Sequence, residues 1–335
     1  MAVYTEVSDD ALSDFLAAYD VGALLSFKGI AEGVENTNYF VQTSKAPFIL
    51  TLYERRVDPD DLPFFLGLMD HLARAGLACA TPVATRDGVL LGRLADRPAV
   101  LVTFLEGVWP RKPKVAQCEA VGAALAKLHQ AGSDFRLTRA NALGVADWRP
   151  LYDRFAPHAD RIAPGLAATI EEHLLTLERA WPTTLPRGVI HADLFPDNVF
   201  FRGDDVTGLI DFYFACNDAL AYDVAVCLNA WCFEADHAFN ITKGQALLRG
   251  YTSVRALEPQ ECEALPLLAR GAALRFLLTR AYDWLNTPED ALVKPHDPLA
   301  YLRRLRFHAA IDDASAYGLE VGGDSVAVRQ EGVSA

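Results

Sequence analysis

The sequence lacks several features that would assign it to a class of protein at once. None of its six cysteines forms a C-x-x-C pair, and no apolar run is long enough to span a bilayer. Basic residues are also scarce, with 31 Lys and Arg against 44 Asp and Glu, which gives a formal net charge of −13. Nucleic acids and anionic membranes bind basic surfaces, so we expect neither as a partner.

The net charge does not exclude a small molecule that carries phosphate, because such a ligand needs only local donors and often brings its own cation. The six cysteines are expected to be buried thiols, not a disulfide framework or a zinc site. The first ten residues, MAVYTEVSDD, show no basic segment followed by an apolar one. We therefore expect no signal peptide and a cytoplasmic location.

The N-terminal third alternates between strand and helix patterns. A short helix is expected after Ser8, a plausible N-cap, because Leu12, Phe15, Leu16 and Tyr19 recur at helical spacing. Runs of β-branched and aromatic residues bounded by turn residues predict an antiparallel sheet. The strands are expected at 24–30, 38–43, 48–54, 88–94 and 98–107, with a helix at 61–77.

The remainder of the chain is predicted to be mostly helical. The segment EGVWPRKPKV at 106–115 has two prolines, a glycine and a basic cluster, which suit a hinge. A helix follows, with an apolar face of Val115, Cys118, Val121, Leu125 and Leu128. We predict an α+β fold with a small lobe at 1–105, a hinge at about 103–110, a large lobe at 106–315, and a disordered tail at 316–335. A cleft between lobes is where ligands tend to bind.

One segment of the large lobe stands out. VIHADLFPDNVFF at 189–201 places polar residues between two strand-like ends, and Asp193 and Asn198 form the only D-x-x-x-x-N spacing in the chain. Asp211 follows thirteen residues after Asn198, at the end of an apolar run. Successive strands over 189–214 would bring these three side chains to one end of a hairpin.

These residue types suit phosphoryl transfer. Mg²⁺ prefers oxygen ligands and keeps several waters, so Asn198 and Asp211 together with phosphate oxygens would hold it. Asp193 would orient an acceptor hydroxyl and accept its proton, and positioning and charge neutralisation would supply most of the catalysis.

Other interpretations of the segment stay open. Asp, Asn and Pro are ordinary turn residues, so the segment can be a plain turn. His191, Asp193 and Asp211 can instead belong to a metal hydrolase, although a two-metal hydrolase usually needs more ligands than this neighbourhood offers. A kinase-like fold that binds nucleotide without catalysis is a third possibility.

The motif resembles a known superfamily. HADLFPDN with LIDF resembles the catalytic and metal-binding segments of the aminoglycoside-phosphotransferase-like kinases, relatives of the protein kinases. The stretches GIAEGVENTNYFV and FILTLYERRV, with residues 212–234 and 279–308, are similar to the bacterial homoserine kinase family within it. The similarity covers roughly residues 3–312.

The resemblance implies a two-lobed protein-kinase-like fold and ATP- and Mg²⁺-dependent phosphorylation of the L-homoserine side-chain hydroxyl, in threonine biosynthesis. It implies Asp193 as the catalytic aspartate and Asn198 and Asp211 as magnesium ligands. His191 would be the structural histidine of the catalytic loop, and Asp223 would brace that loop or simply be an acidic residue in the first turn of a helix. Rival kinases of choline, aminoglycosides or sugars would differ only in the acceptor pocket.

The nucleotide site departs from the superfamily pattern. Thr51 stands where a phosphate-clamping lysine is expected, and no glutamate lies between Glu54 and Glu106 to pair with one. Phosphate neutralisation would then fall on Mg²⁺, on the loop backbone from Gly33 through Glu35 to Asn36, and on a basic residue. The basic candidates are Lys28, Arg55 and Arg56, and the backbone from Thr103 to Leu105 would contact adenine.

An amino acid acceptor needs a cation for its carboxylate, and arginine offers bidentate geometry. We predict Arg280 as this carboxylate ligand, with Trp231 and Trp284 as walls of the pocket. Further candidates for acceptor contacts are Arg275, Asp283, Asn229 and Glu234. The oligomeric state and any feedback regulation are not encoded in a recognisable motif.

Overall fold

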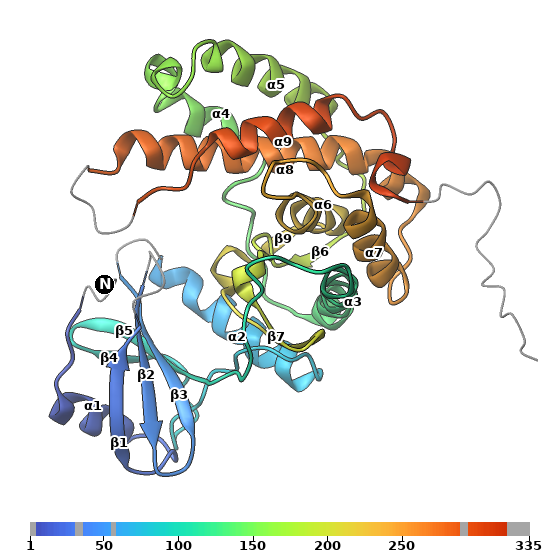
Figure 1. The fold of residues 1–335 in the computed structure, drawn as a ribbon. Coiled ribbons are helices and arrows are strands. Elements are labelled where there is room, and N and C mark those ends of the chain that lie inside the picture. Colours follow the sequence, from blue (N-terminus) through green and yellow to red (C-terminus); the bar gives the residue numbers. More distant parts are fainter. Residues whose placement is uncertain (1–4, 31–35, 55–57, 289–293, 320–335) are drawn as a thin grey trace, which may run out of the picture.

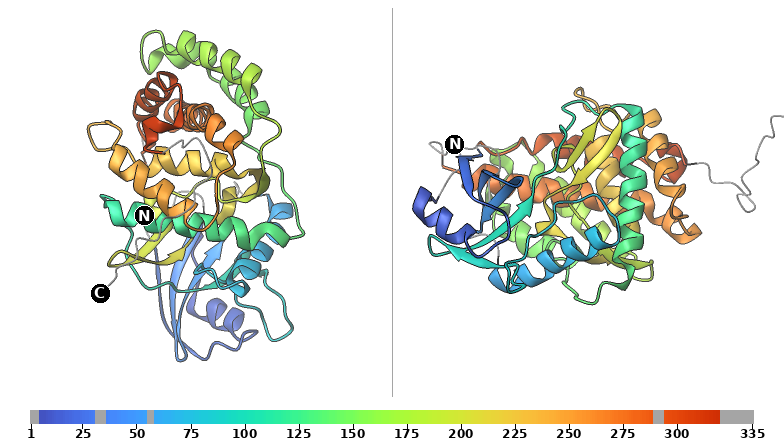
Figure 2. Two further views of the ribbon diagram at one scale, coloured as in Figure 1. Left: turned by 90° about the vertical axis from the view of Figure 1, so that its right-hand side faces the viewer. Right: turned by 90° about the horizontal axis from the view of Figure 1, so that it is seen from below.

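The computed structural model describes residues 5–30, 36–54, 58–288 and 294–319. Figure 1 and the two views of Figure 2 show a sheet at one end of the molecule and helices at the other. The helices are α1 (Asp9–Leu16), α2 (Leu62–Arg74), α3 (Val115–Ala131), α4 (Val145–Asp153), α5 (Leu166–Ala180), α6 (Leu220–Trp231), α7 (Ile241–Thr252), α8 (Pro259–Asn286) and α9 (Leu299–Ala309). The strands are β1 (Leu24–Gly29), β2 (Thr37–Thr43), β3 (Pro47–Leu52), β4 (Gly92–Leu94), β5 (Arg97–Thr103), β6 (Arg187–Ile190), β7 (Val199–Arg202), β8 (Asp205–Leu209) and β9 (Cys216–Ala219).

The predicted antiparallel sheet is confirmed, in the order β1-β2-β3-β5-β4. In β2 the residues alternate strictly between buried and half-buried, which is the period-two pattern of a strand with one face on a core. Helix α1 packs on that face through Leu12 and Leu16, and Ser8 caps it by accepting a hydrogen bond from the Ala11 N–H.

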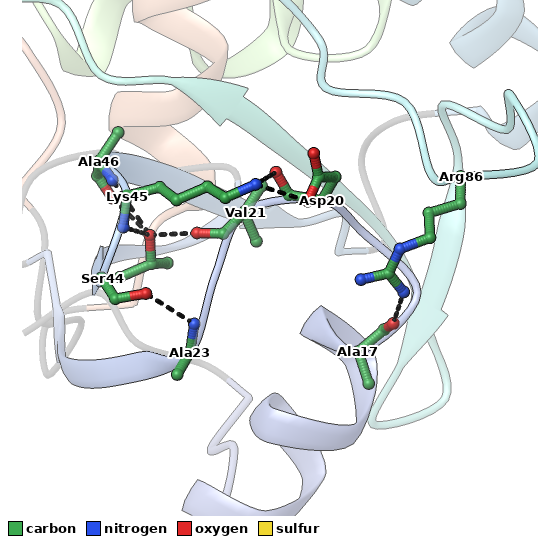
Figure 3. A network of polar contacts seen from close by, with 9 residues as sticks. Ala17, Asp20, Val21, Ala23, Ser44, Lys45, Ala46 and Arg86 are labelled. Atoms are coloured by element: carbon green, nitrogen blue, oxygen red, sulfur yellow. Dashed lines mark hydrogen bonds and ion pairs between the residues drawn. The ribbon is translucent and has the colours of Figure 1, made fainter.

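A polar network joins the end of α1 to the β2–β3 turn, and Figure 3 shows it closely. The Thr43 hydroxyl donates to the Val21 carbonyl at 2.6 Å, and the Ala23 N–H donates to the Ser44 hydroxyl at 3.0 Å. Lys45 adds an exposed ion pair to Asp20, which contributes little because water screens it. The buried hydroxyl of Thr43 therefore anchors the segment between α1 and β1 to the end of β2.

The described residues form two hydrophobic cores. The smaller core lies between α1 and the sheet, with Leu12, Val41 and Leu50 at its centre. The larger core fills the helical end and also takes in the buried face of α2. Helix α2 precedes the hinge in sequence, yet Phe65 and Leu68 pack with residues of the large lobe. The small lobe is thus tied to the large one by side-chain packing as well as by the hinge.

The β7–β8 hairpin holds the two lobes together by backbone hydrogen bonds. Leu209 in β8 donates to the Ala78 carbonyl at 3.0 Å and accepts from the Ala80 N–H at 3.1 Å. Phe201 in β7 and Val108 in the hinge exchange both of their backbone hydrogen bonds at 3.0 Å. The hairpin therefore sits where the chain passes from one lobe to the other.

Three expectations need correction. Strand β6 pairs with β9, not with the hairpin strands, and β9 was not predicted. Val115 is exposed at the start of α3, whereas the other four members of the predicted apolar face are fully buried. The predicted disordered tail begins too early, because the fully buried Tyr317 bonds to Nδ1 of His308 at 2.8 Å. Residues 320–335 lie outside the described residues. Among the described residues, no helix is both long and apolar enough to cross a bilayer.

Candidate active site

The catalytic loop between β6 and β7 is held by two buried side chains from the helical lobe. Asp223 on α6 accepts the backbone N–H groups of His191 at 2.7 Å and Ala192 at 2.8 Å. Arg275 on α8, which is 2% exposed, donates to the Ala192 carbonyl. Ala192 has φ of 62°, a left-handed conformation that is costly for a residue with a Cβ atom. These hydrogen bonds offset that cost and fix the direction in which Asp193 leaves the loop.

His191 links the catalytic loop to the loop after β8. Its Nε2 bonds to the Ile210 carbonyl at 3.0 Å, so Nε2 carries the proton and Nδ1 accepts the Asp193 N–H at 3.3 Å. Burial lowers the pKa of His191, which keeps the ring neutral and this tautomer in place. His191 is therefore a structural residue of the loop.

Asn198 and Asp211 meet because of the hairpin register. Val199 pairs with Leu209, and the Ile210 N–H donates to the Asn198 carbonyl at 3.0 Å. The amide nitrogen of Asn198 donates to the Asp193 carbonyl at 2.8 Å, which directs its oxygen away from the loop. Asp211 is exposed and has φ of 63°. The structure thus brings Asp193, Asn198 and Asp211 to one place through backbone contacts.

One face of helix α6 packs against the catalytic loop. Asp223, Cys227 and Trp231 recur at a spacing of four residues, and all three are fully buried. The Leu194 carbonyl accepts from the Trp231 indole N–H at 2.7 Å and lies 3.8 Å from the Cys227 sulfur. The prediction that Trp231 walls an acceptor pocket is therefore wrong, because the ring is covered by protein and supports the loop.

Asp223 is an ionised carboxylate inside the core. Burial alone would raise its pKa, but the hydrogen bonds from His129 and from the His191 backbone N–H hold the pKa below its usual value. His129 on α3 approaches it at 3.1 Å and in turn bonds to the Tyr251 hydroxyl at 2.8 Å. One carboxylate thereby joins α3, α6 and α7 to the catalytic loop.

A cluster of neutral polar groups occupies the position of the expected lysine. The Thr51 hydroxyl donates to the Asn38 carboxamide oxygen at 2.7 Å. The Tyr53 and Tyr213 hydroxyls lie 3.0 Å apart, and the charge of Asp211 adds to the burial that raises the pKa of both. Thr51 and its neighbours are therefore close to the Asp211 side of the site.

The other residues predicted for the nucleotide are partly described. Asn36 is buried and accepts the Glu54 N–H at 3.3 Å. The Thr103 N–H donates to the Thr81 carbonyl, and the Thr103 hydroxyl accepts from the Thr81 N–H. Within the described residues the Leu105 N–H has no hydrogen-bond partner. Lys28 is exposed on β1, whereas Gly33, Glu35, Arg55 and Arg56 lie outside the described residues.

The predicted acceptor residues divide into two groups. Arg275 and Asn229 are buried structural residues, and Glu234 pairs with Lys243 at 2.6 Å. Arg275 and Asn229 are therefore not available as acceptor ligands, whereas the assignment of the exposed Glu234 stays a prediction. Arg280 is half-buried on α8, and its guanidinium carbon lies 4.5 Å from the centre of the Tyr301 ring. No described group of three or more His, Cys, Asp or Glu side chains forms a metal cluster.

Comparisons with known proteins show the family and the fold of the chain. Residues 26–257, more than half of the chain, match the family described as the phosphotransferase enzyme family. Homoserine kinase of Azorhizobium caulinodans is 66% identical over 319 residues, covering 95% of this chain and 99% of that protein. Homoserine kinase of Rhodopseudomonas palustris is 63% identical over 324 residues, covering 96% of this chain and 99% of that protein.

The chain belongs to the homoserine kinase family. Among solved structures, a spectinomycin phosphotransferase in complex with ADP and its antibiotic superposes with a TM-score of 0.68 at 12% identity. That superposition covers 94% of this chain and 98% of the other, so the two share a fold. The two-lobed fold expected from the sequence is thereby confirmed.

The brace formed by Asp223 in this homoserine kinase family member can be tested directly. Asp223→Asn replaces one accepting oxygen by an NH₂ group, so a loop N–H loses its partner inside the core. We expect the free energy of unfolding to fall by about 3 kcal/mol, with a lower kcat because the loop is misplaced. Urea unfolding measures the first effect, with the exposed Asp312→Asn as the control. Wild-type stability in Asp223→Asn would contradict the brace.

Proposed function

We propose that this chain transfers the γ-phosphoryl group of ATP to the side-chain hydroxyl of L-homoserine, giving O-phospho-L-homoserine for threonine biosynthesis. The convergence of Asp193, Asn198 and Asp211 at the end of one hairpin carries the proposal. The relatives named homoserine kinase support the acceptor, since they match nearly the whole chain at more than 60% identity.

In this proposal Asp193 orients the acceptor hydroxyl and takes its proton as the bond to the γ-phosphorus forms and the bond from that phosphorus to the leaving ADP breaks. Its position is fixed because the loop around it is tied at Ala192, at His191 and at the Asn198 amide. A carboxylate held at a set distance from the hydroxyl supplies catalysis chiefly by positioning.

The donor set at Asn198 and Asp211 fits Mg²⁺. One carboxamide oxygen and one carboxylate are hard ligands, and they leave most of the coordination sphere to water and phosphate. Bound Mg²⁺ would neutralise phosphate charge. The left-handed backbone of Asp211 and the hydrogen bond that fixes the Asn198 amide set where those two oxygens lie.

We place ATP between the hinge and the small lobe. The Leu105 N–H is available to an adenine edge, and the polar cluster around Thr51 and Asn38 faces the phosphate side. The ADP complex of the spectinomycin phosphotransferase concerns that protein, and it supports the use of an adenine nucleotide here by shared fold.

A coupled assay of ADP formation with a panel of acceptors tests the function. We expect turnover with L-homoserine and Mg²⁺, and much lower kcat/KM with L-serine, choline or an aminoglycoside. Omission of Mg²⁺ should abolish turnover. If choline or an aminoglycoside were the preferred acceptor, the chain would be a choline kinase or an aminoglycoside kinase instead. ATP binding without turnover on any acceptor would indicate an inactive module, and phosphate ester hydrolysis without ATP would indicate a hydrolase.

A further inference from the structure

Two arginines from different helices meet on one tyrosine ring beside the catalytic loop. Helices α8 and α9 lie side by side (Figure 1), and Tyr301 on α9 is fully buried between them. The guanidinium carbon of Arg280 on α8 and that of Arg304 on α9 each lie 4.5 Å from the centre of this ring. Both arginines are half-buried, so part of each remains accessible.

These two cations have no carboxylate partner in the described part of the chain. Arg304 donates to the Asn229 carbonyl at 2.6 Å and packs 5.1 Å from the Phe233 ring, contacts that orient it without neutralising it. Arg280 has only its contact with the Tyr301 ring, and it forms no ion pair with any described residue. Partly buried charges that form no ion pair are costly, so an anion that contacted both arginines would stabilise them.

The electrostatics agree with that geometry. Burial lowers the pKa of Arg280 and the nearby positive charge of Arg304 lowers it further, whereas Tyr301, Asp193 and Asp297 act in the opposite direction. Two positive groups that repel each other at one site gain most from a single anion that contacts both. Arginine is also the side chain best suited to bind a carboxylate through two parallel hydrogen bonds.

The pair lies close to the catalytic aspartate. The negative charge of Asp193 is among the influences on the pKa values of both Arg280 and Tyr301. Ring contacts give a continuous path as well, from Phe195 in the catalytic loop to Phe276 at 4.9 Å and on to Tyr301 at 5.1 Å. An acceptor whose hydroxyl faces Asp193 would therefore carry its anionic group on the side where Arg280 and Tyr301 lie.

We propose that Arg280 and Arg304 together bind the α-carboxylate of the acceptor, so that the site selects hydroxylated amino acids over amino alcohols that lack this group. The proposal rests on the proposed function, because it assigns one end of the same acceptor. Tyr301 is a positioning residue, whose ring holds both guanidinium groups in place. Arg304 is a specificity residue that sequence reasoning missed.

The test compares L-homoserine with 3-aminopropan-1-ol, which is the same molecule without its carboxylate. In Arg280→Gln and Arg304→Gln we expect kcat/KM for L-homoserine to fall about 10²-fold each, because each loses a charge-assisted hydrogen bond to a partly buried carboxylate. The kcat/KM for 3-aminopropan-1-ol and the KM for ATP should change little. The wild-type preference for L-homoserine should largely disappear in the double variant.

Matched controls separate binding from folding. Arg303→Gln removes an exposed cation from the neighbouring position of α9 and should keep the wild-type preference. Arg280→Lys keeps the positive charge without the forked geometry of arginine. Its kcat/KM for L-homoserine should lie between those of Arg280→Gln and the wild type. Because Arg304 also contacts Asn229, urea unfolding of each variant serves as the separate check that it is folded.

Each outcome has one meaning. A wild-type enzyme that uses L-homoserine, with both arginine variants keeping its preference over 3-aminopropan-1-ol, would overturn the carboxylate assignment and leave the proposed function intact. A wild-type enzyme that does not use L-homoserine would overturn the proposed function itself. Equal losses on both acceptors would show that the arginines act on the loop and not on the carboxylate, which also overturns the assignment.

Discussion

Asp193→Asn should lower kcat by about 10²–10⁴-fold while ATP still binds with nearly unchanged affinity. The substitution keeps the size of the side chain and removes its ability to accept the hydroxyl proton. The loop around it should stay in place, because its hydrogen bonds to Asp223 and to Asn198 use the backbone of residues 191–193. Steady-state kinetics gives kcat, and isothermal titration with ATP gives the dissociation constant.

Asp204→Asn is the matched control for that experiment. Asp204 is an exposed carboxylate in the turn of the same hairpin, where it makes only a distant ion pair of 3.6 Å with Lys114. Its loss should leave kcat unchanged. Unchanged turnover in Asp193→Asn would remove Asp193 from the mechanism, and loss of ATP binding in that variant would show that the aspartate serves the nucleotide instead.

The catalytic segment was accessible to sequence reasoning because its geometry is local. Asp193 and Asn198 lie in one short loop, and the hairpin that follows returns the chain to Asp211 after one turn. Only the register of β7 against β8 had to be assumed. The helices and the antiparallel sheet were accessible for a similar reason, since amphipathic periods and turn residues are local signals.

Residues whose role depends on distant contacts were harder to assign. Strand β9, with the sequence CNDA, has little β propensity and forms because β6 needs a partner. Trp231 and Arg275 look like acceptor residues in the sequence, and only tertiary packing shows that both support the loop. One signal was present, since Asp223, Cys227 and Trp231 share a helical face, which indicates that they meet the same partner.

The missing lysine has a structural counterpart that could not be predicted. Thr51 replaces the expected lysine, so a glutamate to pair with that lysine is not needed. The position is filled by the hydroxyls of Thr51, Tyr53 and Tyr213. Glu54 instead accepts from the Thr37 hydroxyl at 2.8 Å and pairs with Arg97 at 3.1 Å. Because the described groups at this position are neutral, we expect Asp211 to be the residue whose loss affects metal binding most.

Asp211→Asn should raise the Mg²⁺ concentration for half-maximal activity by roughly 10–100-fold and lower kcat at saturating metal by about 10²-fold or more. Asparagine tolerates the left-handed backbone at φ of 63° as well as aspartate does, so the change removes charge without moving the chain. The carboxamide keeps one oxygen for the metal, which is why the expected result is weaker binding and not its abolition. A titration of activity with Mg²⁺ at fixed, saturating ATP measures both quantities.

Asp96→Asn is a close control, because Asp96 is another exposed aspartate with a left-handed backbone, at φ of 59° in the turn between β4 and β5. It should titrate like the wild type, which would show that the effect at Asp211 comes from its place beside Asn198. If the Asp211→Asn titration coincided with the wild type, Asp211 would not be a metal ligand. The metal would then have to be held by Asn198 and phosphate alone, and the two-ligand arrangement proposed for this hairpin would be wrong.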